Sequence, residues 1–235
     1  MLADPRLAAA AAAGLEEVTL TTLSGKEVKA SLAVPAELPA PAVLLIHEWW
    51  GLNDQIKAVA AELANQGFLT LAVDLYGGEV ATDPTDAQNH MNAVDPEQAT
   101  ETLAGWIGWL KADSRGTGKV ATVGWCFGGA WSLNASIAAP VDATVIYYGR
   151  VERSPEDLAK LEGPVLGHFA EQDKWINREM VAGFEKNMGL AGKTLEVHWY
   201  DADHAFANPT GDNYRKPEAE LAWSRTLAFL RQNLG

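Results

Sequence analysis

The sequence predicts one α/β domain over residues 1–235, built on a mostly parallel sheet with helices on both faces. Short apolar runs typical of buried parallel strands alternate along the chain with longer segments whose apolar residues recur at helical spacing. The chain has 235 residues, of which 48% are hydrophobic, and this is enough to bury one full core. It contains no internal repeat and no low-complexity linker that would divide it into separate domains.

The pattern begins with an antiparallel hairpin. Residues 18–23 and 28–34 alternate between apolar and polar side chains on either side of a Ser-Gly-Lys turn. We expect Asp54 to cap the first long helix and Gly67 to end it, while the Gly-, Pro- and Asp-rich residues 77–96 predict a long loop. The other expected strands are residues 43–46, 68–73, 120–125, 143–148, 165–170 and 195–200. The other expected helices are residues 97–112, 127–138, 178–190 and 217–233.

The chain is strongly acidic. It has 18 Lys and Arg against 31 Asp and Glu, a net charge of -13, and no Lys or Arg lies between Lys57 and Lys111. Such a charge repels phosphate backbones and anionic membrane surfaces, so we expect neither nucleic acid nor a membrane as a partner. No apolar run approaches the ~20 residues of a membrane span.

The single cysteine fits a reducing compartment, so we expect a cytoplasmic protein. The alanine tract at residues 8–13 follows Asp4 and Arg6 and precedes Glu16 without a cleavage-site pattern. It therefore predicts a frayed N-terminal helix rather than a signal peptide.

Cys126 lies in the most informative stretch, a Gly-x-Cys-x-Gly pattern formed with Gly124 and Gly128. An expected strand ends just before it and an expected helix begins just after it. Small residues on both sides of a nucleophile allow a strained strand-to-helix turn, the nucleophile elbow. At a helix N-terminus, backbone N–H groups and the helix dipole favour a thiolate. The pattern favours a cysteine nucleophile over a buried structural cysteine in a Gly-rich turn.

A cysteine nucleophile needs a base, and five histidines are available. His47 ends a buried strand and His90 lies in the acidic loop. His168 and His198 lie inside strands, where core or face positions explain them. His204 instead follows the strand 195–200 at its carboxyl end, where catalytic groups of open α/β sheets collect. We therefore expect His204 to be the base.

The base needs an acid that orients it. Glu171 and Asp173 follow the strand 165–170 at its carboxyl end, while Asp201 and Asp203 lie beside His204 in the sequence. Adjacent loop side chains usually point apart and Asp203 is typical of a turn, so we favour Asp173, with Glu171 as its rival. Nucleophile, acid and histidine then follow one another in the chain order of α/β hydrolases.

The turn at residues 47–51 contains Glu48 and Trp49 and follows the expected strand 43–46. In α/β hydrolases such a loop supplies one N–H of the oxyanion hole, and the residue after the nucleophile supplies the other. We expect the backbone N–H groups of Trp49 and Phe127 to form this hole. Because a carboxylate would repel an oxyanion, Glu48 is either a salt-bridged surface acid or a group that takes a proton from Cys126 and controls its ionisation.

These stretches resemble the dienelactone hydrolase (carboxymethylenebutenolidase) family of the α/β-hydrolase superfamily. The matching segments are residues 47–51, 68–76, 124–129, 147–149 and 198–206, together with Asp173. The resemblance implies an α/β-hydrolase fold with about eight strands and a Cys126–Asp173–His204 triad. It implies that Glu48 holds the resting thiol and removes its proton once substrate enters. It also implies activity on enol lactones, with no cofactor and no metal.

The sequence departs from the family where substrate is bound. The family grips the carboxylate of dienelactone with arginines. One of them comes four residues after the catalytic histidine, where this chain has Asn208, and another comes from the segment that here lacks Lys and Arg. An amide cannot replace a bidentate guanidinium at an anion site. We therefore expect a neutral ester or lactone, rather than dienelactone itself, as the substrate of a monomeric enzyme.

Several of the nine tryptophans adjoin the expected catalytic loops. Aromatic side chains at such positions either line an apolar acyl pocket or pack in the core. We expect the substrate-binding residues to be Trp50, Tyr148, Trp175, Phe206 and Asn208.

Two other functions remain open. The acyl substrate could be a thioester or a peptide instead of an ester or lactone. Alternatively, the chain could be a non-enzymatic ligand-binding or redox-sensing protein that uses Cys126. The sequence holds no second cysteine that would resolve an oxidised thiol, which disfavours the sensor.

Overall fold

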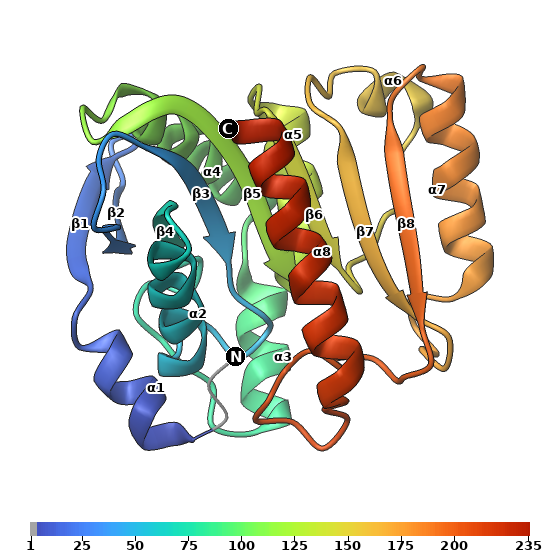
Figure 1. Ribbon diagram of the computed structural model, residues 1–235, viewed down its shortest axis with the longest axis horizontal. Helices are drawn as coiled ribbons and strands as arrows, with labels where there is room; N and C mark the ends of the chain where they lie inside the picture. The colour runs from blue at the N-terminus through green and yellow to red at the C-terminus, as the bar shows by residue number, and fades with distance from the viewer. Residues whose placement is uncertain (1–3) are drawn as a thin grey trace. The chain divides into compact units, whose positions relative to one another are not determined.

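The computed structural model describes residues 4–235, which fall into two units, one ending at Val120 and the other beginning at Ala121. The first unit holds four strands in the order β1-β2-β4-β3. These strands are β1 (Glu16–Thr21), β2 (Glu27–Ala33), β3 (Ala40–Ile46) and β4 (Leu69–Val73), and the helices are α1 (Pro5–Ala12), α2 (Asp54–Asn65), α3 (Pro84–Ala93) and α4 (Pro96–Ala112). Figure 1 shows α2 in front of the strands of this unit and α4 behind them.

Strand β5 (Gly116–Trp125) runs into the second unit, whose strands follow the order β5-β6-β7-β8. The other elements here are β6 (Ala143–Tyr147), β7 (Val165–Ala170), β8 (Leu195–Tyr200), α5 (Phe127–Ala138), α6 (Pro155–Leu158), α7 (Arg178–Leu190) and α8 (Lys216–Leu234). In Figure 1, α8 lies in front of these strands and α5 behind them. Their carboxyl ends lie at one edge, so the loops after β5, β7 and β8 meet there.

Strand direction follows from the sequence pattern. The half-exposed, alternating strands β1 and β2 form the antiparallel hairpin, with Glu16 opposite Leu32, and β2 also pairs antiparallel with β4. The continuous apolar strands pair in parallel, β3 with β4 and β5 to β8 in succession. Eight strands, mostly parallel after an N-terminal hairpin, confirm the predicted α/β class. The single domain over residues 1–235 stays a prediction.

The predicted loop at residues 77–96 was wrong, because α3 occupies Pro84–Ala93. Only Ala87 of this helix is buried, so no apolar periodicity marks it in the sequence. Local chemistry forms it instead. Asp83 accepts hydrogen bonds from the N–H groups of Thr85 and Asp86, and Pro84 occupies the first turn. The short helix α6 was missed for the same reason, since it relies on a Ser154 cap.

The core of the second unit on the α5 and α7 side is apolar and closed. Most of its members come from β6, β7 and the three helices α5, α6 and α7, and include Leu133, Ile146, Leu158, Val165, Phe169, Val181, Phe184 and Met188. Alternation along β6 and β7 directs Tyr147 and His168 to the opposite side, where both contact Thr226 of α8. No helix within residues 4–235 is both long and apolar enough to cross a membrane.

The glycine before the elbow has a steric requirement that can be tested. A Cβ on Gly124 would collide with the backbone carbonyl of Gly128, and neither backbone segment can move cheaply. We expect Gly124→Ala to lower the free energy of unfolding by about 2–3 kcal/mol or to prevent folding. The control is Gly183→Ala in α7, where a Cβ meets nothing within 4 Å, and there we expect stabilisation of about 1 kcal/mol. Urea denaturation measures both, and equal effects would contradict the prediction.

Candidate active site

Cys126 occupies the turn between β5 and α5 with φ 54° and ψ -116°. This left-handed backbone is unfavourable for a residue with a Cβ and costs of order 1–3 kcal/mol unless its surroundings fix it. Its N–H donates to the carbonyl of Tyr147 at 3.0 Å, and its own carbonyl accepts from Gly129 and Ala130 in the first turn of α5. These hydrogen bonds fix the turn that carries the thiol.

The imidazole of His204 connects two other predicted residues. Its Nε2 lies 3.1 Å from Sγ of Cys126, and its Nδ1 lies 2.6 Å from Oδ2 of Asp173. The rival acid does not share this position, because Glu171 pairs instead with Arg178 at 2.9 Å on the surface. The second unit therefore brings Cys126, His204 and Asp173 into one hydrogen-bonded series.

The Asp173 carboxylate is buried and uses both of its oxygens. Oδ2 holds His204, while Oδ1 accepts the backbone N–H groups of Trp175 and Ile176 at 2.8 and 3.0 Å. Burial opposes ionisation, but the hydrogen bonds from His204 and from the two N–H groups outweigh it and lower the pKa of Asp173. One ionised carboxylate thus orients the imidazole and also fixes the backbone that carries Trp175.

His204 has the opposite shift. Burial disfavours its charged form, but hydrogen bonds to Asp173 and Cys126 raise the pKa of His204 to about 10. The imidazole is therefore protonated at neutral pH. It lies between the Asp173 carboxylate and the sulfur of Cys126.

Aromatic rings surround the imidazole. The rings of Tyr148 and Trp175 meet His204 edge-on, with centroids 5.1 and 5.2 Å away. Tyr148 is fully buried and has φ 36°, whereas Trp175 is 68% exposed. Phe206 is buried behind Tyr148 at 5.4 Å between centroids. Of the predicted binding residues, Tyr148 and Trp175 contact His204 directly.

The loop after His204 has its own fixed geometry. Ala205 has φ 64°, and the His204 carbonyl accepts a hydrogen bond from Nδ2 of Asn213 at 3.0 Å. Oδ1 of the nearly buried Asn208 accepts both the N–H and the hydroxyl of Thr210, at 2.9 and 2.8 Å. Asn208 therefore closes the turn that follows the imidazole, a role that the sequence comparison with the family arginine did not suggest.

Glu48, Trp49 and Trp50 lie in the first unit, in the loop after β3. Glu48 is almost fully buried, so it is not the exposed surface acid of the simpler interpretation. The rings of Trp49 and Trp50 pack edge-on at 5.0 Å. Gly51 has φ 90° and passes so close to the Glu79 carbonyl that a side chain would collide with it. The loop is therefore closely fixed within its own unit.

Two residues that sequence reasoning did not select fix this loop. His47 Nδ1 lies 2.5 Å from the Glu48 carbonyl, and its Nε2 accepts the N–H of Leu75 at 3.2 Å. These contacts require the neutral tautomer with the proton on Nδ1, and burial lowers the pKa of His47 accordingly. The Tyr76 hydroxyl donates to the Trp49 carbonyl at 3.1 Å. In the sequence, the only indication of this role for His47 is its position directly before Glu48.

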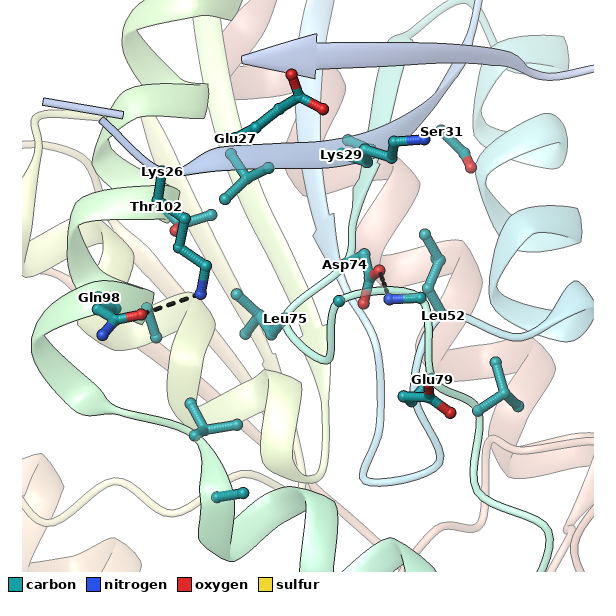
Figure 2. A pocket seen from close by; sticks show the side chains of 18 of the residues that line it. Lys26, Glu27, Lys29, Ser31, Leu52, Asp74, Leu75, Glu79, Gln98 and Thr102 are labelled. Atoms are coloured by element: carbon teal, nitrogen blue, oxygen red, sulfur yellow. Dashed lines mark hydrogen bonds between the residues drawn. The ribbon is translucent and has the colours of Figure 1, made fainter. Parts of the chain in front are cut away.

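A cleft of about 720 Å³ also lies in the first unit, between β2, the loop after β4 and α4. Figure 2 shows Lys26 and Gln98 on one side of it and Asp74 on the other. Lys26 donates to Gln98 at 3.0 Å, and Asp74 accepts the N–H of Gly78. Its lining is charged with both signs, and the described lining residues include neither Cys nor His. The cleft therefore lacks a nucleophile and base of the kind found around His204.

Among residues 4–235, no group of three or more His, Cys, Asp or Glu side chains is arranged to hold a metal ion.

The chain is similar to known proteins over almost its whole length. The model of the dienelactone hydrolase family matches residues 28–234. Carboxymethylenebutenolidases of Pseudomonas putida and Pseudomonas knackmussii are each 31% identical over 231 residues, covering 92% of this chain and 95% of theirs. The crystal structure of a dienelactone hydrolase-like promiscuous phosphotriesterase from metagenomic libraries superposes with a TM-score of 0.84 at 22% identity, covering 94% of this chain and 99% of that one. This similarity confirms the α/β-hydrolase fold.

The protonation of His204 gives a direct test of the site. Because its folded pKa of about 10 exceeds the ordinary 6.5, the stabilisation from the protonated imidazole is complete below pH 6.5 and is lost as pH rises toward 10. We expect the His204 signal in a nitrogen-15 NMR titration to stay imidazolium at pH 8. Asp173→Asn should lower its midpoint, because the carboxylate that stabilises the charge is gone. His204→Asn assigns the signal, and a wild-type midpoint near 6.5 would contradict the geometry.

Proposed function

This chain belongs to the dienelactone hydrolase family and is a hydrolase of ester or lactone bonds, and we propose that Cys126 is its nucleophile. The assignment rests chiefly on one observation, the series in which His204 lies 3.1 Å from the sulfur of Cys126 and 2.6 Å from the carboxylate of Asp173. In this proposal His204 is the general acid and base, and Asp173 holds its ring and stabilises its positive charge.

The chemistry proceeds in two stages. The Cys126 thiolate attacks the acyl carbon, and the carbonyl electron pair moves to oxygen to give a tetrahedral intermediate. The backbone N–H groups of Phe127 and Trp49 are proposed to stabilise that oxyanion. The C–O bond then breaks, and the imidazolium of His204 gives its proton to the departing oxygen. In the second stage His204 takes a proton from water, hydroxide adds to the thioester, and the acid leaves as Cys126 is regenerated.

We assign Glu48 to control of the thiol. A thiolate permanently paired with an imidazolium would be open to oxidation, and a nearby carboxylate opposes that ionisation by repulsion. In this proposal Glu48 keeps the resting thiol protonated and accepts its proton when substrate enters. The near-complete burial of Glu48 argues against the role of a solvent-exposed surface acid. The fixed loop supports a defined position for its side chain.

The proposed substrate is a neutral carboxylic ester or lactone. No Lys or Arg lies between Lys57 and Lys111, and Asn208 stands where the family has an arginine, so a carboxylate-bearing lactone lacks both cationic partners. Exposed beside His204, the ring of Trp175 offers an apolar face to the acyl or leaving group. Trp50, Tyr148, Phe206 and Asn208 complete the proposed binding set. We propose that the enzyme works as a cytoplasmic monomer without a cofactor.

Loss of the nucleophile tests the function. We expect wild-type protein to hydrolyse neutral aryl esters and lactones with higher kcat/KM than dienelactone, and Cys126→Ala to lower kcat by at least about 10³-fold. Chromogenic release and titration of the released acid measure the reaction. Lys174→Ala, on the same edge, is the control that should retain activity. Turnover retained in a folded Cys126→Ala variant would show that the nucleophile lies elsewhere.

Glu48→Gln separates a controlling carboxylate from a structural one. The amide removes both the repulsion and the base, so we expect kcat to fall while the pH midpoint for alkylation of Cys126 by iodoacetamide moves down. A structural residue would change neither quantity in a protein that remains folded. Glu79→Gln is the matched control in the same unit, and we expect it to leave both quantities unchanged. An upward midpoint with normal turnover would contradict the assignment.

A further inference from the structure

Five side chains beneath the active site form a continuous hydrogen-bonded series that the proposed reaction does not use. Arg225 donates to the Tyr200 hydroxyl at 3.0 Å, and that hydroxyl lies 2.8 Å from Nδ1 of His168. Nε2 of His168 lies 3.0 Å from the Thr226 hydroxyl, which lies 2.6 Å from the hydroxyl of Tyr147. The series crosses β8, β7, α8 and β6, so it joins four elements that are distant in the sequence.

The contacts determine where the protons lie. Arg225 has only donors, so the Tyr200 oxygen accepts from it and gives its own proton to Nδ1 of His168. His168 then carries its proton on Nε2 and donates it to Thr226. Burial, with added repulsion from His198 and Arg225, lowers the pKa of His168 well below its ordinary value, which keeps this neutral tautomer. The three inner groups of the series, Tyr200, His168 and Thr226, then each have one defined partner on either side.

The series ends directly under the strained backbone of the site. Through Thr226 the side chain of His168 holds Tyr147, whose ring stacks on Trp125 at 4.9 Å and whose carbonyl accepts the N–H of Cys126. The carbonyl of His168 accepts the N–H of Tyr148 at 2.8 Å. Tyr148 has φ 36°, and its ring lies against His204. A positive φ in a bulky residue persists only where the surroundings fix it.

We propose that His168, with Thr226 and Tyr200 as its partners, is a positioning residue that holds Tyr147 and Tyr148 so that Cys126 and His204 stay aligned. It acts through the backbone on both sides of it, since its side chain fixes one tyrosine and its carbonyl fixes the next. This inference rests on the proposed function of the Cys126 thiol.

Simple packing predicts a different behaviour. Thr226→Val preserves shape, so a packing role would leave the site unchanged. In a positioning role, the same change leaves the His168 N–H and the Tyr147 hydroxyl without their shared partner, and the ends of β6 and β7 lose their alignment. Misplacement of reacting groups by a fraction of an ångström lowers kcat strongly and affects substrate binding much less.

The main experiment compares three variants. For Thr226→Val we expect kcat to fall about tenfold with KM nearly unchanged, and the pH midpoint of Cys126 alkylation to rise because the thiolate loses its aligned imidazolium. Thr226→Ser restores the hydroxyl and should return both quantities to wild type. Thr70→Val, at a buried threonine of β4 whose hydroxyl bonds only a backbone carbonyl among the described contacts, should lower stability while leaving both quantities unchanged.

Tyr200→Phe is a second, independent variant, and it can be measured even if Thr226→Val does not fold. It removes the proton donated to His168 but retains the ring, which stacks on Phe206 at 4.9 Å. As for Thr226→Val, we expect kcat to fall and the pH midpoint of Cys126 alkylation to rise. Wild-type values for both in folded Tyr200→Phe, or a Thr226→Ser variant as impaired as Thr226→Val, would overturn the proposal.

The readouts separate this inference from the proposed function. Alkylation of Cys126 needs no substrate, so the midpoint shift can be measured even if the protein hydrolyses none of the esters and lactones tested. Absence of turnover in wild type would contradict the proposed substrates alone. An unchanged midpoint in both folded variants would contradict the positioning role alone.

Discussion

Cys126 and Tyr148 both have positive φ angles, and a backbone hydrogen bond to the neighbouring strand holds each of them. Cys126 donates to the carbonyl of Tyr147, and Tyr148 donates to the carbonyl of His168. Beyond β7, Glu171 donates in turn to the carbonyl of Tyr200. The sheet ladder thus continues one step past the ends of β5, β6 and β7. Hydrogen bonds that would otherwise stop at the strand ends hold the strained residues around the thiol.

Side-chain partners compensate the charge that is buried at the site. A buried charge is costly without such a partner, and His204 has an acid on one side and a sulfur on the other. The same Asp173 that stabilises the imidazolium closes the turn carrying Trp175. Electrostatic stabilisation and loop geometry therefore depend on one carboxylate, and a change at Asp173 alters both.

In the first unit, hydrogen bonds also fix the backbone of the loop that carries Glu48. Its loop is fixed by contacts from the segment after β4, through the imidazole of His47 and the hydroxyl of Tyr76. His47 in one unit and His168 in the other are both buried, neutral histidines that join backbone segments rather than exchange protons with substrate. Burial keeps both imidazoles neutral. A charged imidazole would lose the acceptor nitrogen on which each contact depends.

The sequence by itself determined the α/β class, the elbow at Cys126 and the loop position of His204. These are local properties, since strand and helix periods, glycine requirements and chain order are all legible over a few residues. It did not reveal α3, whose single buried residue gives no period, and it left Glu171 beside Asp173 as a candidate acid. Two acids two residues apart look alike until the backbone shows which one turns inward.

Tertiary structure alone decided which acid meets His204 and which side chains support the strained backbone. Asp173 and His204 are 31 positions apart, and His168 and Thr226 are 58 positions apart, so their contacts depend on how β7, β8 and α8 pack. From the sequence, His168 was explained as a core or face residue of its strand, which gave it no special role. Only the arrangement of four elements around it supplied the two hydroxyls that give it a defined tautomer, because hydrogen-bond partners are selected by distance in space and not along the chain.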